Sequence, residues 1–345
     1  MRWLSTKRIW LTLCIITAAI ITYIVVAGFI LPASRCYLVG DVFGGVGTPS
    51  DETLTRAFAQ EQINWEIAYW SAMISEYTFE KPSYPAYNRA LSALGFTTMR
   101  IYSFFEHEGE LKDDIMVDAG IKEIFAGDGT SFTLVVIAFR GSVPIALDSP
   151  TTRENMRRNI DFLPRPWGEA EATVHRGFYG QYRDFVANIL PEINDKLNLS
   201  IMQNSSAANH SVKFWLTGHS MGGALAELFT LGLVESGIDP AKIMTYGFAT
   251  PLVASRGLQE HAQLAGASDR IFRIIHRRDM VAFVGYRLLW GRSLAADDNV
   301  VGFGRRGVFD RRHHSLPRVY LPFVISQNDQ PLRQYMEVFF IVDDM

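Results

Sequence analysis

The chain has 345 residues, a formal net charge of −3, 20% charged and 48% hydrophobic residues. A chain of this length and composition buries a large core and is not disordered. A nearly balanced charge argues against a nucleic-acid-binding protein, and only two cysteines exclude a disulfide scaffold or a cysteine-based zinc module.

The N-terminal region contains an uncharged run of 23 residues, Ile9–Leu31. A transmembrane helix needs about 20 apolar residues, whereas the apolar part of a cleaved signal peptide has about 7–15. Residues 1–35 are therefore predicted to form a cytoplasmic stub and a transmembrane signal anchor. Because Arg2, Lys7 and Arg8 precede the run, we expect a membrane protein whose remaining chain lies in the periplasm, a lumen or the extracellular space.

A glycine-rich segment, residues 36–50, is typical of a linker, and residues 51–345 are expected to form one domain. Apolar residues have helical spacing over Asp51–Tyr77, with Asp51 as the expected N-cap. Three runs rich in β-branched and aromatic residues come next: Thr97–Phe105, Ile121–Phe125 and Phe132–Phe139. The last of them is apolar throughout and fits a central strand that is buried on both faces.

The second half of the domain alternates predicted strands and helices. The expected strands are Val212–Thr217, Ile243–Phe248 and Ile271–His276, and the expected helices are Met221–Ser236 and Ser255–Ala265. Such alternation is typical of crossover units on a parallel sheet. The sequence therefore predicts an α/β fold with a mostly parallel sheet flanked by helices.

The strongest motif is Gly218-His219-Ser220-Met221-Gly222, a G-x-S-x-G sequence between a predicted strand and a predicted helix. A serine on such a tight turn projects its Oγ above the sheet, where it can act as a nucleophile. The glycines around it permit the close approach of neighbouring backbone. We therefore expect Ser220 to be the nucleophile of a serine hydrolase.

The acid of the expected catalytic triad follows the serine in chain order in enzymes of this sheet type. Asp279 lies just beyond the carboxyl end of the strand Ile271–His276, where active residues of such sheets are found. Asp239 and Asp269 precede strands and would lie at the opposite edge. The sequence thus favours Asp279.

The base must follow the acid, which leaves His313 and His314. We prefer His314, which adjoins Ser315-Leu316-Pro317, and keep His313 as the alternative. A metal site that combines Asp310 with the two histidines is less favoured, because no third well-spaced set of ligands is visible.

An oxyanion hole requires two hydrogen-bond donors. The expected donors are the backbone N–H of Met221, directly after the nucleophile, and that of Ser142, in the loop after the strand that ends at Phe139. The Ser142 hydroxyl would assist. The chemistry requires no cofactor and no metal.

Five ordered blocks resemble the fungal-type (class 3) lipases of the α/β-hydrolase fold. These blocks are Phe139–Ser142, Val174–Phe178, Gly218–Ala226, Tyr246–Pro251 and Arg273–Val281, within roughly residues 51–325. The resemblance implies Ser220 as nucleophile, Asp279 as acid, a late histidine as base and Ser142 as an oxyanion residue. It also implies a structural role for His175 and a lid over Val143–Ile160.

The expected function is therefore that of a membrane-anchored serine carboxylester hydrolase that acts on acylglycerols or related lipids. A short-chain esterase, thioesterase or acyltransferase would use the same residues. A non-catalytic interaction protein with this fold is a further alternative, and the presence of all three triad residue types in order argues against it. The expected partners are a lipid ester substrate and a membrane, with no nucleic acid.

Overall fold

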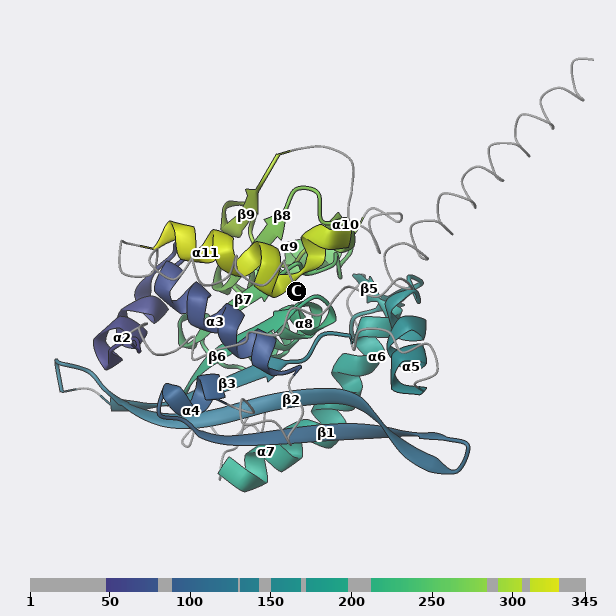
Figure 1. The fold of residues 1–345 in the computed structure, drawn as a ribbon, viewed down its shortest axis with the longest axis horizontal. Coiled ribbons are helices and arrows are strands. Elements are labelled where there is room, and N and C mark those ends of the chain that lie inside the picture. The colour runs from purple at the N-terminus through teal and green to yellow at the C-terminus, as the bar shows by residue number, and fades with distance from the viewer. Residues whose placement is uncertain are drawn as a thin grey trace, which may run out of the picture.

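The computed structural model describes residues 48–79, 89–129, 131–142, 150–168, 172–197, 212–283, 291–305 and 311–328. Within these ranges a seven-stranded sheet has the spatial order β1-β2-β3-β6-β7-β8-β9 (Figure 1). Its strands are β1 (Thr97–His107), β2 (Glu110–Phe125), β3 (Ser131–Phe139), β6 (Val212–His219), β7 (Ile243–Phe248), β8 (Ile271–His276) and β9 (Val300–Phe303). A separate two-stranded sheet joins β4 (Pro164–Pro166) and β5 (Thr173–His175).

The strands from β3 to β9 in the large sheet are parallel, and β1 and β2 form an antiparallel pair at one edge. The register places Phe139 opposite Gly218, and His219 opposite Phe248. The carboxyl ends of β3, β6 and β7 therefore meet at one edge of the sheet. This mostly parallel sheet is the predicted α/β architecture.

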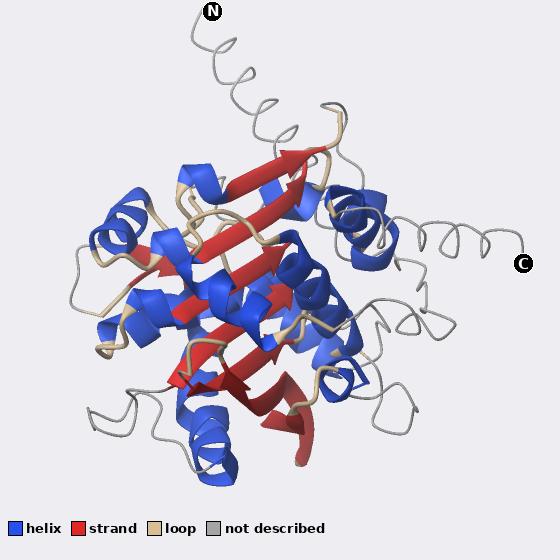
Figure 2. Cartoon of the chain, turned by 90° about the vertical axis from the view of Figure 1, so that its left-hand side faces the viewer, coloured by secondary structure: helices blue, strands red, loops and turns tan. Residues whose placement is uncertain are grey.

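Helices cover both faces of the sheet (Figure 2). Alternate residues of each central strand enter two separate hydrophobic cores, as Val135 and Ile137 do on one face and Leu134 and Val136 on the other. One core packs against α6 (Arg176–Asp184), α7 (Leu190–Leu197), α8 (Met221–Glu235) and α9 (Arg256–Leu264). The other packs against α2 (Asp51–Ala59), α3 (Trp65–Tyr77), α4 (Arg89–Ala93) and α11 (Leu321–Gln327). Two further helices, α5 (Pro150–Asn159) and α10 (Met280–Phe283), border the edge where the strands end.

The single helix expected over Asp51–Tyr77 is two helices, α2 and α3, and its expected N-cap is wrong. Ser50 caps α2, since its Oγ accepts the Thr53 N–H at 3.1 Å. The Asp51 carboxylate instead accepts the Phe125 N–H at 3.1 Å and so ties α2 to the end of β2. The Asp51 side chain, which the local pattern assigned to the helix cap, therefore makes a long-range hydrogen bond instead.

The predicted signal anchor, Ile9–Leu31, lies outside the described residues. Within the part of the chain that the structure describes, none of the helices combines the length and apolar character that a membrane crossing requires.

Candidate active site

Ser220 occupies a sharp turn between β6 and α8. Its backbone has φ 58° and ψ −127°, a positive φ that side-chain-bearing residues rarely adopt. The Ser220 N–H donates to the Phe248 carbonyl oxygen at 2.9 Å, which fixes the turn against β7. Such strain persists only where the surrounding structure imposes it, and it is typical of functional sites.

Two glycines make this turn possible. A methyl group on Gly218 would lie 2.3 Å from the Gly222 carbonyl carbon, and one on Gly222 would lie 2.1 Å from the Phe139 carbonyl oxygen. Both distances are far below van der Waals contact, so larger residues would push the turn away from its neighbours. The glycines of the motif are therefore required by packing at both sides of Ser220.

His314 connects Ser220 to Asp279. Its Nε2 lies 2.8 Å from the Ser220 Oγ, and its Nδ1 lies 2.9 Å from the Asp279 Oδ2. The serine hydroxyl can donate to Nε2 while the Nδ1–H donates to the carboxylate. The His314 side chain is 21% exposed, whereas that of Asp279 is fully buried. A substrate can therefore reach the imidazole but not the carboxylate.

Three further donors converge on the Asp279 carboxylate. The N–H of Val281 reaches Oδ1 at 2.9 Å and that of Ala282 at 3.4 Å, and the Tyr320 hydroxyl donates to Oδ2 at 2.5 Å. Burial, followed by the nearby Asp279 charge, raises the pKa of Tyr320 well above its usual value, so this phenol remains a donor. These donors hold the Asp279 carboxylate in one orientation toward His314.

The structure separates the two candidate bases. His314 contacts Ser220, whereas the His313 ring stacks on His276, with centroids 4.1 Å apart and an interplanar angle of 10°. Burial, and next His313, lowers the pKa of His276 to about 4. The structure thus places the preferred base, His314, beside Ser220 and gives the alternative, His313, a packing position.

His219 fixes the backbone of the preferred base. Its Nε2 lies 2.8 Å from the His314 carbonyl oxygen, so the Nε2–H tautomer donates there. Burial, followed by the proximity of His314, lowers the pKa of His219, which keeps the ring neutral. His219, a variable position of the G-x-S-x-G motif, therefore positions the backbone of His314. The sequence reasoning did not assign this role.

The loop after β3 lies against the nucleophile turn. A methyl group on Gly141 would lie 2.6 Å from the His219 carbonyl oxygen and 3.5 Å from the Ser220 Cβ. The next residue, Ser142, receives a hydrogen bond on its Oγ from Asn159 Nδ2 at 2.7 Å. Both expected oxyanion residues therefore border Ser220, and Asn159 of α5 positions one of them.

Met221, the other expected oxyanion residue, begins α8 directly after Ser220. Its Sδ accepts from the Ser142 hydroxyl at 3.5 Å and from Gln181 Nε2 at 3.1 Å. The side chain is buried, so these contacts hold the first turn of α8 against α6 and the Ser142 loop. The backbone N–H of Met221 is thereby kept beside the nucleophile.

His175 lies apart from this chain of hydrogen bonds. It caps α6, with its Nδ1 accepting the Phe178 N–H at 3.3 Å, and its ring stacks on Phe178 at 4.0 Å. Burial lowers its pKa to about 4. The packing role implied by the family resemblance fits this position.

The expected lid is described only in part, since residues 143–149 lie outside the described ranges. Its remainder forms α5, whose last residue is Asn159. The alternative metal site is also only partly described, because Asp310 lies outside those ranges. Among the residues that are described, no cluster of three or more His, Cys, Asp or Glu side chains could hold a metal ion.

Sequence reasoning missed three supporting residues, Tyr320, Asn159 and His219. Tyr320 follows His314 by six residues, and a hydroxyl close behind a predicted base is the one signal that the sequence offered. Nothing in the sequence pattern indicates that Asn159 reaches back to Ser142, because their contact spans the lid segment.

Comparisons with known proteins find relatives among lipases. The family described as Lipase (class 3) matches residues 136–288. The triacylglycerol lipase OBL1 of Arabidopsis thaliana is 30% identical over 196 residues, which cover 47% of this chain and 36% of that protein. The chloroplastic phospholipase A1 PLIP1 of the same plant is 28% identical over 36% of this chain and 18% of its own length. The chain thus spans well under half of these curated relatives.

Among solved structures, the triacylglyceride lipase of Rhizomucor miehei aligns with 64% of this chain and 73% of its own chain, at 18% identity and a TM-score of 0.45. The family match covers the end of β3, the nucleophile turn and Asp279. Over these residues the chain is similar to the class 3 lipase family.

Proposed function

We propose that the protein is a serine carboxylester hydrolase that cleaves ester bonds of acylglycerols or related lipids. The observation that carries the proposal is the continuous chain of hydrogen bonds from Ser220 through His314 to Asp279. The strained turn of Ser220 and the match of residues 136–288 to the class 3 lipase family support it independently.

In the first half of the reaction, Ser220 Oγ attacks the ester carbonyl carbon while His314 Nε2 takes the hydroxyl proton. The tetrahedral intermediate then collapses, the ester C–O bond breaks, and His314 returns the proton to the departing alcohol. An acyl group remains on Ser220. In the second half, water attacks the acyl carbon while His314 takes its proton, the bond from this carbon to Ser220 Oγ breaks, and His314 returns the proton to Oγ as the fatty acid leaves.

Asp279 holds the imidazole in the tautomer that presents Nε2 to Ser220, and its charge stabilises the imidazolium that forms. The buried position of the carboxylate and its three other donors keep it in one orientation. The N–H groups of Met221 and Ser142 would stabilise the oxyanion. One such donor contributes about 10²–10³ in rate in serine hydrolases.

The lipid nature of the substrate is supported by the relatives, one named a triacylglycerol lipase and another a phospholipase A1. Both names denote enzymes that act on carboxylic esters of glycerolipids. A series of nitrophenyl esters with increasing acyl length, each measured in solution and in emulsion, separates the proposed lipase from a short-chain esterase. The proposal predicts a preference for long chains and emulsions.

The decisive experiment is the variant Ser220→Ala. Ester turnover is expected to fall by about 10⁴–10⁶, and labelling by a fluorophosphonate probe is expected to disappear. Ser92→Ala, which alters an exposed serine on α4, is the matched control and should retain both properties. Near-native turnover in folded Ser220→Ala protein would refute the assignment.

A further inference from the structure

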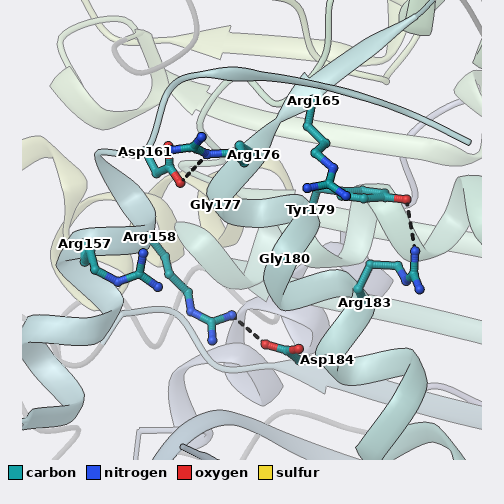
Figure 3. A pocket seen from close by; sticks show the side chains of 10 residues that line it. All are labelled: Arg157, Arg158, Asp161, Arg165, Arg176, Gly177, Tyr179, Gly180, Arg183 and Asp184. Carbon is teal, nitrogen blue, oxygen red and sulfur yellow. Dashed lines mark hydrogen bonds and ion pairs between the residues drawn. The ribbon is translucent and has the colours of Figure 1, made fainter.

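A pocket of about 490 Å³ lies between α5, α6 and the segment that leads into β4 (Figure 3). Five arginines line it: Arg157, Arg158, Arg165, Arg176 and Arg183. Among the described residues that line it, only Asp161 and Asp184 carry negative charge. Glu154 of α5 also pairs with Arg157 and Arg158, at 2.6 and 2.8 Å, so five arginines face three carboxylates here and the balance is positive.

The carboxylates lie toward two sides of the pocket, where they pair with individual arginines. Arg176 Nε lies 2.8 Å from Asp161 Oδ2, and Arg158 Nη1 lies 2.7 Å from Asp184 Oδ2 (Figure 3). These pairs fix the walls of the pocket, since one joins the segment after α5 to α6 and the other joins the two helices. The pocket is therefore a built feature rather than a chance gathering of long side chains.

Two other arginines contact an aromatic ring instead. The guanidinium of Arg165 lies 5.8 Å from the centre of the Tyr179 ring, and that of Arg183 lies 6.0 Å from it and donates from Nη1 to the Tyr179 hydroxyl at 3.5 Å (Figure 3). A guanidinium has five N–H donors in a planar fork, so one bond to a hydroxyl leaves Arg183 with donors that match the oxygens of a phosphate. Arg165 and Arg183 are thus suited to bind one phosphate group together beside Tyr179.

The segment between α5 and β4 adds apolar side chains at the rim. Ile160 is 41% exposed and Leu163 is 54% exposed, and Asp161 between them lines the pocket. Large apolar side chains that are held in water beside a cationic pocket favour an interface with both charged and hydrocarbon zones. A free phosphate ion would give these two residues no partner.

We propose that this pocket and its rim dock the protein on an anionic phospholipid surface. Arg165 and Arg183 bind the headgroup phosphate, while Ile160 and Leu163 enter the acyl region. The inference rests on the proposed function only in that a lipid hydrolase must reach a lipid surface. Because Asn159 lies between the pocket residue Arg158 and Ile160 and bonds to Ser142, docking would place the loop beside Ser220 near the lipid.

The test measures depth in the membrane with the full chain. A Ser220→Ala protein, in which Cys14→Ser and Cys36→Ser remove the native thiols, receives a polarity-sensitive dye at Leu163→Cys. The matched protein carries the dye at Leu264→Cys on α9, where the native side chain is 91% exposed. Both are reconstituted in phosphatidylcholine vesicles with and without phosphatidylglycerol, and brominated acyl chains quench any dye that enters the hydrocarbon.

Docking predicts quenching at position 163, but not at position 264, and only when phosphatidylglycerol is present. Arg165→Glu combined with Arg183→Glu should lower the ratio of docked to undocked protein by about tenfold or more. Arg56→Glu combined with Arg256→Glu, the same change of net charge at exposed residues of α2 and α9, should leave it unaltered. Thermal unfolding of each variant verifies the fold, and the missing nucleophile makes the signal independent of hydrolysis.

Three results would overturn the proposal. Equal quenching at position 163 in neutral vesicles would show that the arginines do not direct docking. Loss of quenching on addition of inorganic phosphate, but not of chloride at the same ionic strength, would identify the pocket as a site for the free ion. Quenching that survives the double Arg-to-Glu change in folded protein would assign the lipid contact to another surface.

Discussion

Asp279 and Glu227 are both fully buried carboxylates, but Glu227 faces a buried arginine and Asp279 a partly exposed histidine. Glu227 accepts from the Ser293 hydroxyl at 3.1 Å and the Leu294 N–H at 3.0 Å, and it lies 3.9 Å from Arg273 Nε. Burial raises the pKa of Glu227 and lowers that of Arg273, so each charge needs the other. Asp279 instead faces an imidazole, which can gain and lose a proton while it contacts the exterior.

The two clusters also meet. Arg273 Nη2 donates to the Ala282 carbonyl oxygen at 2.9 Å, and the N–H of Ala282 points to Asp279 Oδ1 at 3.4 Å. The fixed ion pair thus braces the turn that carries the proposed acid. A buried carboxylate can assist proton transfer only where its partner can exchange a proton with a substrate, as His314 can and Arg273 cannot.

The largest expected effect distinguishes the two adjacent histidines. His314→Ala removes the proposed base and should lower kcat by about 10⁴–10⁶. His313→Ala removes a ring that stacks on His276, and kcat should remain within about tenfold because no proton transfer depends on it. Steady-state kinetics on a soluble nitrophenyl ester measures both. Equal, mild losses would show that the base lies elsewhere.

The next effect contrasts the carboxylates directly. Asp279→Asn keeps the side-chain shape but presents the wrong hydrogen-bonding partner to His314, and kcat should fall by about 10⁴ while the protein remains folded. Glu227→Gln leaves Arg273 buried without its counter-charge. Its free energy of unfolding should fall by about 3–5 kcal/mol, with kcat of the folded protein within tenfold. Denaturant unfolding and steady-state kinetics measure both variants. If Glu227→Gln lost kcat and Asp279→Asn lost only stability, Glu227 rather than Asp279 would be the acid.

A third prediction uses His175, whose buried ring lies outside the reactive cluster. Its pKa of about 4 in the folded protein is below the ordinary value near 6.5. The unfolded chain therefore binds a proton first as the pH falls, and stability is lost from about pH 6.5 towards pH 4. The loss should approach about 3 kcal/mol for this group.

The matched variant is His175→Asn, which retains a cap acceptor for Phe178 but does not titrate. It should be less stable than the native protein at pH 7 because the stacking is lost. The difference between the two proteins should narrow as the pH falls to 4, as followed by denaturant unfolding. A constant difference across this range would show that His175 is not buried as the neutral ring.

Sequence patterns predicted much of the scaffold because its determinants are local. The strands β7 and β8 have the predicted bounds, since each is a short apolar run between polar turns. The turn at Ser220 was predictable because strand, glycines and helix adjoin in sequence. The choice between His313 and His314 depends on stacking with His276 from another element, which no local pattern encodes.

The supporting contacts were beyond prediction for the same reason. The reach of Asn159 to Ser142 depends on how α5 packs, and the reach of Tyr320 to Asp279 depends on the turn before α11. Asp51 shows the same effect in the scaffold, where pairing with the end of β2 replaced the expected cap. Side chains whose partners lie on distant elements are placed by packing rather than by their own sequence neighbourhood.

The smallest expected effect tests whether the additional donor to Asp279 matters for chemistry. Tyr320→Phe removes the hydroxyl that donates to Oδ2 and accepts the His276 N–H at 3.0 Å. A buried hydrogen bond to a charged group contributes about 1.5–3 kcal/mol, and part of this should appear as a decrease of about tenfold in kcat at unchanged KM. Tyr246→Phe is the matched control, because that buried hydroxyl bonds only to the Asn64 backbone among the described residues. Both variants should lose stability, but only Tyr320→Phe should lose kcat; an equal loss of kcat in both would make Tyr320 a packing residue rather than a positioning one.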